Sequence, residues 1–166
     1  MADERYADKL KGIKSAEGEA YSEMHQAALR GEVETLKLLL AQGGDARAVD
    51  DTYKMTALHF ACMKGQTECA QMLIENYADV NARTTHERTP LHEATMYRHL
   101  GCTRLMVEAG GDMDAEDDNG LTPRILAHNC KGAYPELLGA SKLEECDGIM
   151  ELFGFNRDDL GLKPPQ

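Results

Sequence analysis

The sequence contains no tryptophan, and aromatic residues make up only 5% of its 166 positions. Hydrophobic residues nevertheless account for 42%, so the core must consist mainly of leucine, alanine, methionine and valine, which suits closely packed helices. No apolar stretch approaches the ~20 residues that span a bilayer. The charged start Met-Ala-Asp-Glu-Arg-Tyr lacks the apolar region of a secretory signal. These absences predict a chain that is neither inserted in a membrane nor secreted.

Basic residues are also few, because 18 lysines and arginines stand against 29 aspartates and glutamates, for a formal net charge of −11. A net negative field argues against binding to nucleic acid or to an anionic membrane. The five cysteines are odd in number and include no Cys-x-x-Cys pair. This pattern predicts reduced thiols in a cytoplasmic or nuclear protein.

What the sequence does contain is a repeat. The tetrad Thr56-Ala57-Leu58-His59 returns 33 residues later as Thr89-Pro90-Leu91-His92, and a further 33 residues later as Thr122-Pro123-Arg124-Ile125. An upstream copy begins with Ser22-Glu23-Met24-His25. Serine and threonine are favoured helix N-caps, and proline is tolerated at the first helical position. Each tetrad is therefore predicted to start a short helix, which a turn and a second helix follow.

A helix-turn-helix unit with this tetrad and this period resembles the ankyrin repeat. The most specific stretches are Thr89-Pro90-Leu91-His92-Glu93-Ala94 and Asp117-x-x-Gly120-x-Thr122-Pro123. Ala57 departs from the pattern where proline is usual, as do Lys54 and Glu87 where the turn glycine is usual. The resemblance implies an all-α solenoid of helix-turn-helix units joined by β-hairpin-like turns, and a module that binds other proteins.

We expect one domain over residues 1–166. Its predicted parts are a capping helix at 1–18, repeats at 19–51, 52–84 and 85–117, a degenerate fourth repeat at 118–155 with an insertion near 131–144, and a flexible tail at 156–166. Tyr6, Leu10 and Ile13 form one stripe of the capping helix, which would cover the first repeat. Ser141-x-x-Glu144 is a capping box that predicts a helix starting after the insertion.

Histidines are the first candidate metal ligands, and the repeat accounts for three of the six. His25, His59 and His92 share one column, and the resemblance implies that each bonds its tetrad hydroxyl and neighbouring backbone. Stacked units lie about 10 Å apart, which is too far for bonds of about 2.1 Å to a single metal ion. Cys69 and Cys102 also share a column, where small buried residues are expected. We predict a structural role for both columns.

The other thiols are Cys62, near a helix end, and Cys130 and Cys146, whose positions beside the insertion allow exposure. His128 lies two residues before Cys130, so a helix would point the two side chains apart, against a catalytic pair. The acidic cluster from Asp112 to Asp118 lacks the glycine and the bidentate glutamate of a calcium loop, and it predicts a solvated hairpin. We therefore predict no catalytic residue, no cofactor and no metal.

A binding surface remains. In the implied stack, hairpin tips and the exposed faces of the first helices line a concave groove, the usual partner site of such solenoids. The residues predicted to bind a partner form a mixed basic and aromatic strip, which consists of Arg30, Tyr53, Lys54, Phe60, Met63, Lys64, His86, Arg88, Glu93, Met96 and Tyr97. Phe60, Met63, Met96 and Tyr97 are its most informative members, because exposed large apolar groups need a reason.

The predicted function is that of a monomeric, non-catalytic adaptor that presents this strip to another protein with acidic and apolar groups. Two alternatives stay open. One is a regulatory subunit or inhibitor of a partner enzyme such as a kinase. The other is an enzyme or small-molecule binder that uses Cys130, His128 and Cys146, and a thiol without a depressed pKa would remove its main support. Asn81 also occupies a hairpin position that resembles sites hydroxylated in some ankyrin-like proteins.

Overall fold

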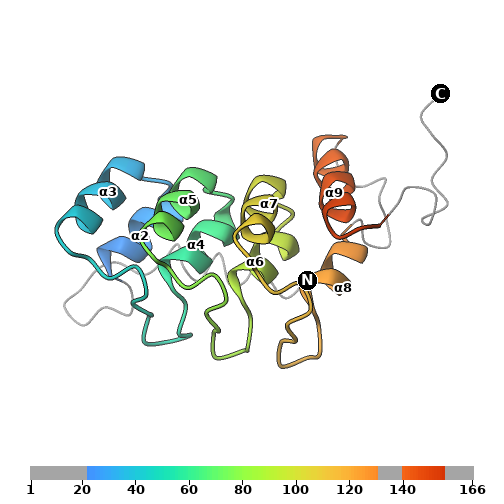
Figure 1. The fold of residues 1–166 in the computed structure, drawn as a ribbon, viewed down its shortest axis with the longest axis horizontal. Helices are drawn as coiled ribbons and strands as arrows, with labels where there is room; N and C mark the ends of the chain where they lie inside the picture. Colours follow the sequence, from blue (N-terminus) through green and yellow to red (C-terminus); the bar gives the residue numbers. More distant parts are fainter. Residues whose placement is uncertain (1–21, 131–139, 156–166) are drawn as a thin grey trace.

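The computed structural model describes residues 22–130 and 140–155. The helices in those ranges come in pairs (Figure 1): α2 Glu23–Arg30 with α3 Val33–Ala41, α4 Ala57–Lys64 with α5 Thr67–Glu75, α6 Pro90–Met96 with α7 Leu100–Glu108, and α8 Pro123–His128 with α9 Ala140–Leu152. Within the same ranges there is no strand, and one isolated bridge joins Val49 to Thr56. The predicted capping helix, most of the insertion and the tail lie outside the described residues.

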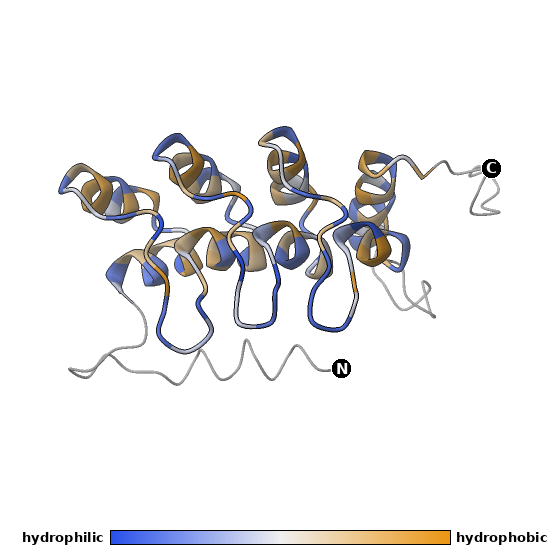
Figure 2. Cartoon of the chain, turned by 60° about the horizontal axis from the view of Figure 1, so that its bottom comes forward, coloured by the Kyte–Doolittle hydropathy of each residue, from blue (hydrophilic) through white to orange (hydrophobic). Residues whose placement is uncertain are grey.

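The paired helices form two layers (Figure 1). The first helices, α2, α4, α6 and α8, pack in sequence order, and the second helices, α3, α5, α7 and α9, do the same. Hydrophilic loops project from one edge of the stack, as Figure 2 shows. None of the helices described is long and apolar enough to cross a membrane. Units that contact only their neighbours make a solenoid, so the predicted all-α solenoid is confirmed.

Helix starts follow the tetrads. Ser22, Thr56 and Thr89 have extended backbone at the N-cap, and each side chain accepts the N–H of the third helical residue. The imidazole of that third residue accepts the N–H of the cap in return, which completes a capping box. In the last copy Thr122 still accepts the N–H of Ile125 at 3.1 Å. Ile125 has no ring to return the bond, so only half of the box remains.

The turn between paired helices requires a residue in the left-handed region. Gly31 and Gly65 supply it with φ of 73° and 72°, and Arg98 occupies the corresponding place at 61°. A Cβ on Gly65 would come within 2.6 Å of the His99 ring, so this turn also needs a bare backbone. At the third turn the residue is not glycine, and the Arg98 side chain reaches the next unit: its Nε donates a hydrogen bond to the Cys130 carbonyl at 2.7 Å.

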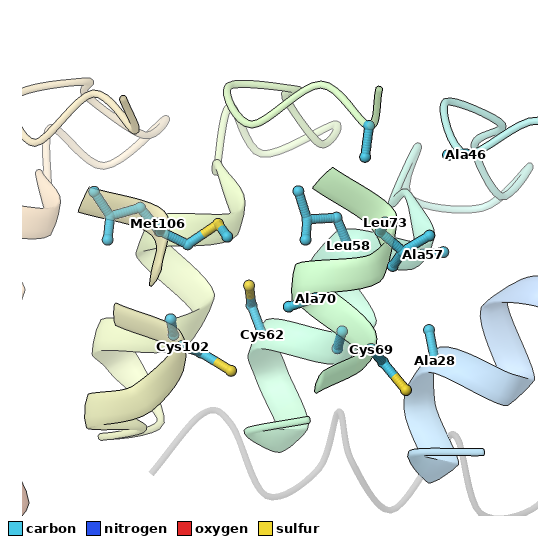
Figure 3. Packing of buried hydrophobic residues seen from close by; sticks show 14 of the residues in the cluster. Ala28, Ala46, Ala57, Leu58, Cys62, Cys69, Ala70, Leu73, Cys102 and Met106 are labelled. Carbon is cyan, nitrogen blue, oxygen red and sulfur yellow. The ribbon is translucent and has the colours of Figure 1, made fainter. Parts of the chain in front are cut away.

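Small side chains allow the helices to approach closely. The alanine column formed by Ala27, Ala61, Ala94 and Ala127 is buried throughout. Figure 3 shows Leu58 of α4 beside Leu73 of α5, with Met106 of α7 reaching toward them. The main core cluster therefore consists mostly of alanine, leucine, methionine and cysteine, with Ile149 and Phe153 added. Alanine, leucine and methionine agree with the sequence prediction, whereas the expected valines are only partly buried.

The last helix departs from the repeat pattern. The predicted N-cap at Ser141 is wrong, because α9 already includes Ala140 and Ser141. Alanine favours the helix, so the helix extends to include the residue before Ser141. The helix packs on α7 and α8. A Cβ on Gly148 would come within 2.6 Å of the Leu100 side chain, so the absence of a side chain at this glycine lets α9 lie close to α7. The described part of the fourth unit thus ends in a helix that covers the stack.

Candidate partner-binding groove

The column histidines link each unit to the hairpin that follows it. In His25, His59 and His92 the Nδ1 atom lies 2.9 Å from the cap hydroxyl and accepts the N–H of the cap residue at 3.1 Å. Each Nε2 lies 3.1 Å from a hairpin carbonyl, which belongs to Ala48, Arg88 and Leu121 in turn. Because Nδ1 accepts and Nε2 donates, each ring is the neutral Nε2–H tautomer. The predicted structural role of this column is confirmed.

Burial keeps these rings neutral. Desolvation lowers the pKa of His59 to about 4. The hydrogen bond to the Arg88 carbonyl acts in the opposite direction and is the largest of the effects that raise this pKa. Burial also lowers the pKa of His25 and of His92. In the part of the chain that the structure describes, no three histidine, cysteine or acidic side chains converge as metal ligands do.

A second column closes the hairpins. The Asp50 carboxylate accepts the N–H groups of Thr52 and Tyr53 at 3.1 and 3.0 Å. Thr84 and Asp117 occupy the same column and accept backbone N–H groups at 3.2 and 2.9 Å. Asp117 is buried by this arrangement, so it is wrongly included in the predicted solvated hairpin.

Neighbouring hairpins are also joined to one another. The N–H of Thr85 donates to the Tyr53 carbonyl at 2.8 Å, and the N–H of Asp118 donates to the His86 carbonyl at 3.1 Å. Because backbone groups make these bonds, the spacing of the hairpin tips does not depend on side-chain rotamers. The hairpins project side by side from one edge of the stack (Figure 2), and together they form a wall of hydrogen-bonded loops.

A groove of about 350 Å³ lies between this wall and the first helices α4 and α6. It is lined by Tyr53, Met55, Met63, Thr84, His86, Arg88, Glu93, Tyr97, Asp118 and Asn119. Six of these belong to the predicted strip. The other four, Met55, Thr84, Asp118 and Asn119, were missed, although they lie in hairpin columns next to residues of the strip.

The apolar side chains at the groove are less exposed than the sequence analysis predicts. Phe60 and Met63 are only 1% and 2% exposed, and with Met55 they form a small cluster against which Tyr53 and Tyr97 pack. The Phe60 ring also meets the ring of His25 edge-on, with centroids 5.6 Å apart. The expected exposure of Phe60 and Met63 is therefore wrong, because these side chains fill the space between successive first helices.

Charges of both signs line the groove. Arg88 Nε lies 3.3 Å from the buried Asp117 carboxylate, and His86 Nδ1 lies 3.0 Å from Asp118. Burial acts to raise the pKa of Asp117, but N–H donors and the Arg88 guanidinium outweigh it and leave this pKa below its ordinary value. Glu93 adds a buried carboxylate to the lining. The lining thus carries the two carboxylates of Glu93 and Asp118 against the one guanidinium of Arg88, so it is not basic.

Comparison with known families agrees with this geometry. A family model described as ankyrin repeats, in three copies, matches residues 24–117, which is more than half of the chain. The chain belongs to the ankyrin-repeat family. Over 59 residues this ankyrin-repeat protein is 41% identical to protein phosphatase 1 regulatory subunit 27 of Mus musculus. The match covers 36% of this chain and 38% of that relative, so the chain spans well under half of the relative's length.

Five predicted binding residues of the ankyrin-repeat protein do not line the groove: the buried Phe60, described above, and Arg30, Lys54, Lys64 and Met96. Lys54 follows Tyr53 at a hairpin tip, where its φ of 56° fits the usual glycine position. Lys64 and Met96 are neighbours in sequence of Met63 and Tyr97. Arg30 ends α2 and lies 3.7 Å from Glu32.

The thiols of the ankyrin-repeat protein are buried. Cys69 and Cys102 are fully buried as predicted. Cys130 and Cys146 are buried as well, so their expected exposure is wrong, because Cys146 on α9 packs against Cys130 within the core. Burial raises the pKa of the Cys130 thiol far above its ordinary value. His128 is exposed, with its ring against Phe155 at 5.3 Å. The catalytic alternative thereby loses its main support.

Asn81 of the ankyrin-repeat protein is exposed, but both the nitrogen and the oxygen of its side-chain amide make hydrogen bonds. Its Nδ2 donates to the Gly110 carbonyl at 3.2 Å, and its Oδ1 accepts the N–H of Asp112 at 2.8 Å. The side chain therefore connects two successive hairpins. Hydroxylation at this position stays a prediction.

Proposed function

We propose that this chain is a monomeric, non-catalytic protein-interaction module that holds a segment of a partner protein in the groove. The observation that carries the proposal is a groove with aromatic, apolar and charged lining, placed on a wall of hydrogen-bonded hairpins. Tyrosine and arginine are enriched among the residues that dominate binding energy. Membership of the ankyrin-repeat family supports the same reading, since such stacks offer concave surfaces to partners.

The lining suggests the chemistry of the partner. An apolar side chain of the partner would lie against Tyr53, Met63 and Tyr97, where its removal from water would favour binding. Acidic residues of the partner would meet the lysines Lys54 and Lys64 at sequence positions next to the lining. Such rim charges act mainly on association rate and specificity.

A pair of matched variants tests the groove. The groove variant carries Lys54→Glu and Tyr97→Ala, and the control carries Lys37→Glu and Tyr77→Ala. Both exchange the same residue types, and neither Lys37 on α3 nor Tyr77 after α5 lines the groove. We expect affinity capture with mass spectrometry to find partners that the wild type and the control retain and the groove variant loses. Equal retention by both folded variants would refute the proposal.

A regulatory role is the second candidate. The likeness to a protein named as a regulatory subunit of protein phosphatase 1 favours regulation over passive scaffolding, and a phosphatase over a kinase as the first enzyme to test. We expect the purified chain to change the activity of the protein phosphatase 1 catalytic subunit, with saturation at one chain per enzyme. If the chain neither binds the protein phosphatase 1 catalytic subunit nor alters its activity, the regulatory role on this enzyme is refuted and the adaptor function remains.

A further inference from the structure

Two buried thiols face each other at the last described helix. Cys130 follows α8, Cys146 lies on α9, and their sulfur atoms are 2.8 Å apart. A disulfide bond is about 2.05 Å long, so the two sulfurs need to approach by less than about 1 Å. The Cys146 thiol also lies 3.3 Å from the Cys130 carbonyl, which accepts the hydrogen bond from Arg98. These two bonds hold the Cys130 carbonyl in place beside the pair.

The position of this pair in the fold differs from that of the other thiols. Cys62 of α4 and Cys102 of α7 lie in the middle of the stack (Figure 3). Among the elements described, α9 contacts α7 and α8 at the end of the stack. Terminal elements open locally at lower free energy than central ones. A small oxidant can therefore reach Cys130 and Cys146 without opening the central repeats.

We propose that Cys130 and Cys146 are a disulfide-forming pair that reacts with hydrogen peroxide, and that the bond fastens α9 to the stack. One thiolate attacks a peroxide oxygen, the O–O bond breaks, and the sulfur becomes a sulfenic acid while the departing hydroxide takes up a proton to form water. The second thiolate attacks the sulfenic sulfur, and its oxygen leaves as a second water. Two thiols and one peroxide thus give one disulfide and two waters.

Burial sets the rate of this reaction. Because desolvation raises the pKa of Cys130, the thiolate forms only when α9 opens and water reaches the sulfur. We therefore expect slower oxidation than for an exposed thiol. Once formed, the bond closes a loop between residues 16 apart, which removes conformational freedom from the unfolded chain.

The test uses the full-length reduced protein and hydrogen peroxide as the probe. After oxidation, the denatured chain is alkylated and analysed by intact mass and by peptide mapping. The expected result is a mass lower by two hydrogens, two fewer alkylated thiols and one cross-linked peptide pair that joins Cys130 to Cys146. The oxidised protein should also melt about 5–10 °C higher than the reduced one.

Two variants separate this pair from other thiol chemistry. Cys146→Ser should abolish the cross-link and the gain in melting temperature, whereas Cys62→Ser with Cys102→Ser should keep both. The mapping on the wild-type protein decides the matter even if a variant folds poorly. A different disulfide, or sulfinic acid at Cys130 or Cys146 without a cross-link, would overturn the proposal.

Discussion

Acidification should destabilise the stack well above the pH at which its carboxylates protonate, because the column histidines are neutral in the folded state. Burial lowers the pKa of His59 from 6.5 to about 4, so the unfolded chain binds more protons than the folded chain between these values. Stability therefore falls as the pH drops through this window. The burial of His25 and His92 lowers their pKa as well, which adds to the effect in the same direction.

The size of the effect follows from His59 alone. One pKa unit corresponds to about 1.4 kcal/mol, so this residue costs about 2 kcal/mol by about pH 5 and about 3 kcal/mol by about pH 4, relative to neutral pH. A loss of this size is a large part of the stability of a typical domain. His25 and His92, whose pKa burial also lowers, add to the loss from His59.

Urea denaturation followed by far-ultraviolet circular dichroism, at neutral pH and at about pH 5, measures this loss. The matched variant is His59→Gln. Glutamine at the third helical position can still complete a capping box with Thr56, but it does not titrate. We expect the variant to be less stable than the wild type at neutral pH, because it lacks the bond to the Arg88 carbonyl. Its stability should then fall by about 2 kcal/mol less on acidification. Equal losses in the two proteins would refute the assignment of a neutral, buried His59.

Two further predictions concern stability near neutral pH. Tyr77 is 79% exposed with a φ of 65°, at the place where Gly43 and Gly110 have φ of 89° and 86°. Tyr77→Gly should therefore raise the free energy of unfolding by about 1 kcal/mol in urea denaturation, and a decrease would show that the left-handed tyrosine carries no strain. Leu91 is fully buried, so Leu91→Ala should cost about 2–5 kcal/mol. Leu38 is 62% exposed, and Leu38→Ala is the control that should change stability by less than about 0.5 kcal/mol. Similar losses in the two leucine variants would contradict the burial pattern.

Most of the fold could be predicted from the sequence because the repeat supplies several copies of each position. Lys54, Glu87 and Arg98 have φ of 56°, 58° and 61°, and only the alignment with glycines in other copies indicates turns at these residues. The column histidines were assigned to structure for the same reason. A single copy would have suggested a metal ligand or a general base instead.

The groove could be predicted only in part, because a column shows which residues are equivalent and not how deeply they lie. Phe60 and Met63 belong to first-helix positions that a stack can expose, but here they pack against Met55 between helices. The Cys130–Cys146 contact could not be predicted at all. It joins the turn after α8 to α9, a helix that begins within the predicted insertion, where no other copy is available for alignment.

The central claim is that a partner protein lies in the groove, and site-specific photo-cross-linking tests it most directly. A benzophenone amino acid replaces Tyr97, which lines the groove, and in a second protein it replaces Tyr77, which does not. After irradiation in cell lysate, we expect a discrete cross-linked partner from position 97 and none from position 77. The same partner from both positions, or a partner from position 77 alone, would contradict the account.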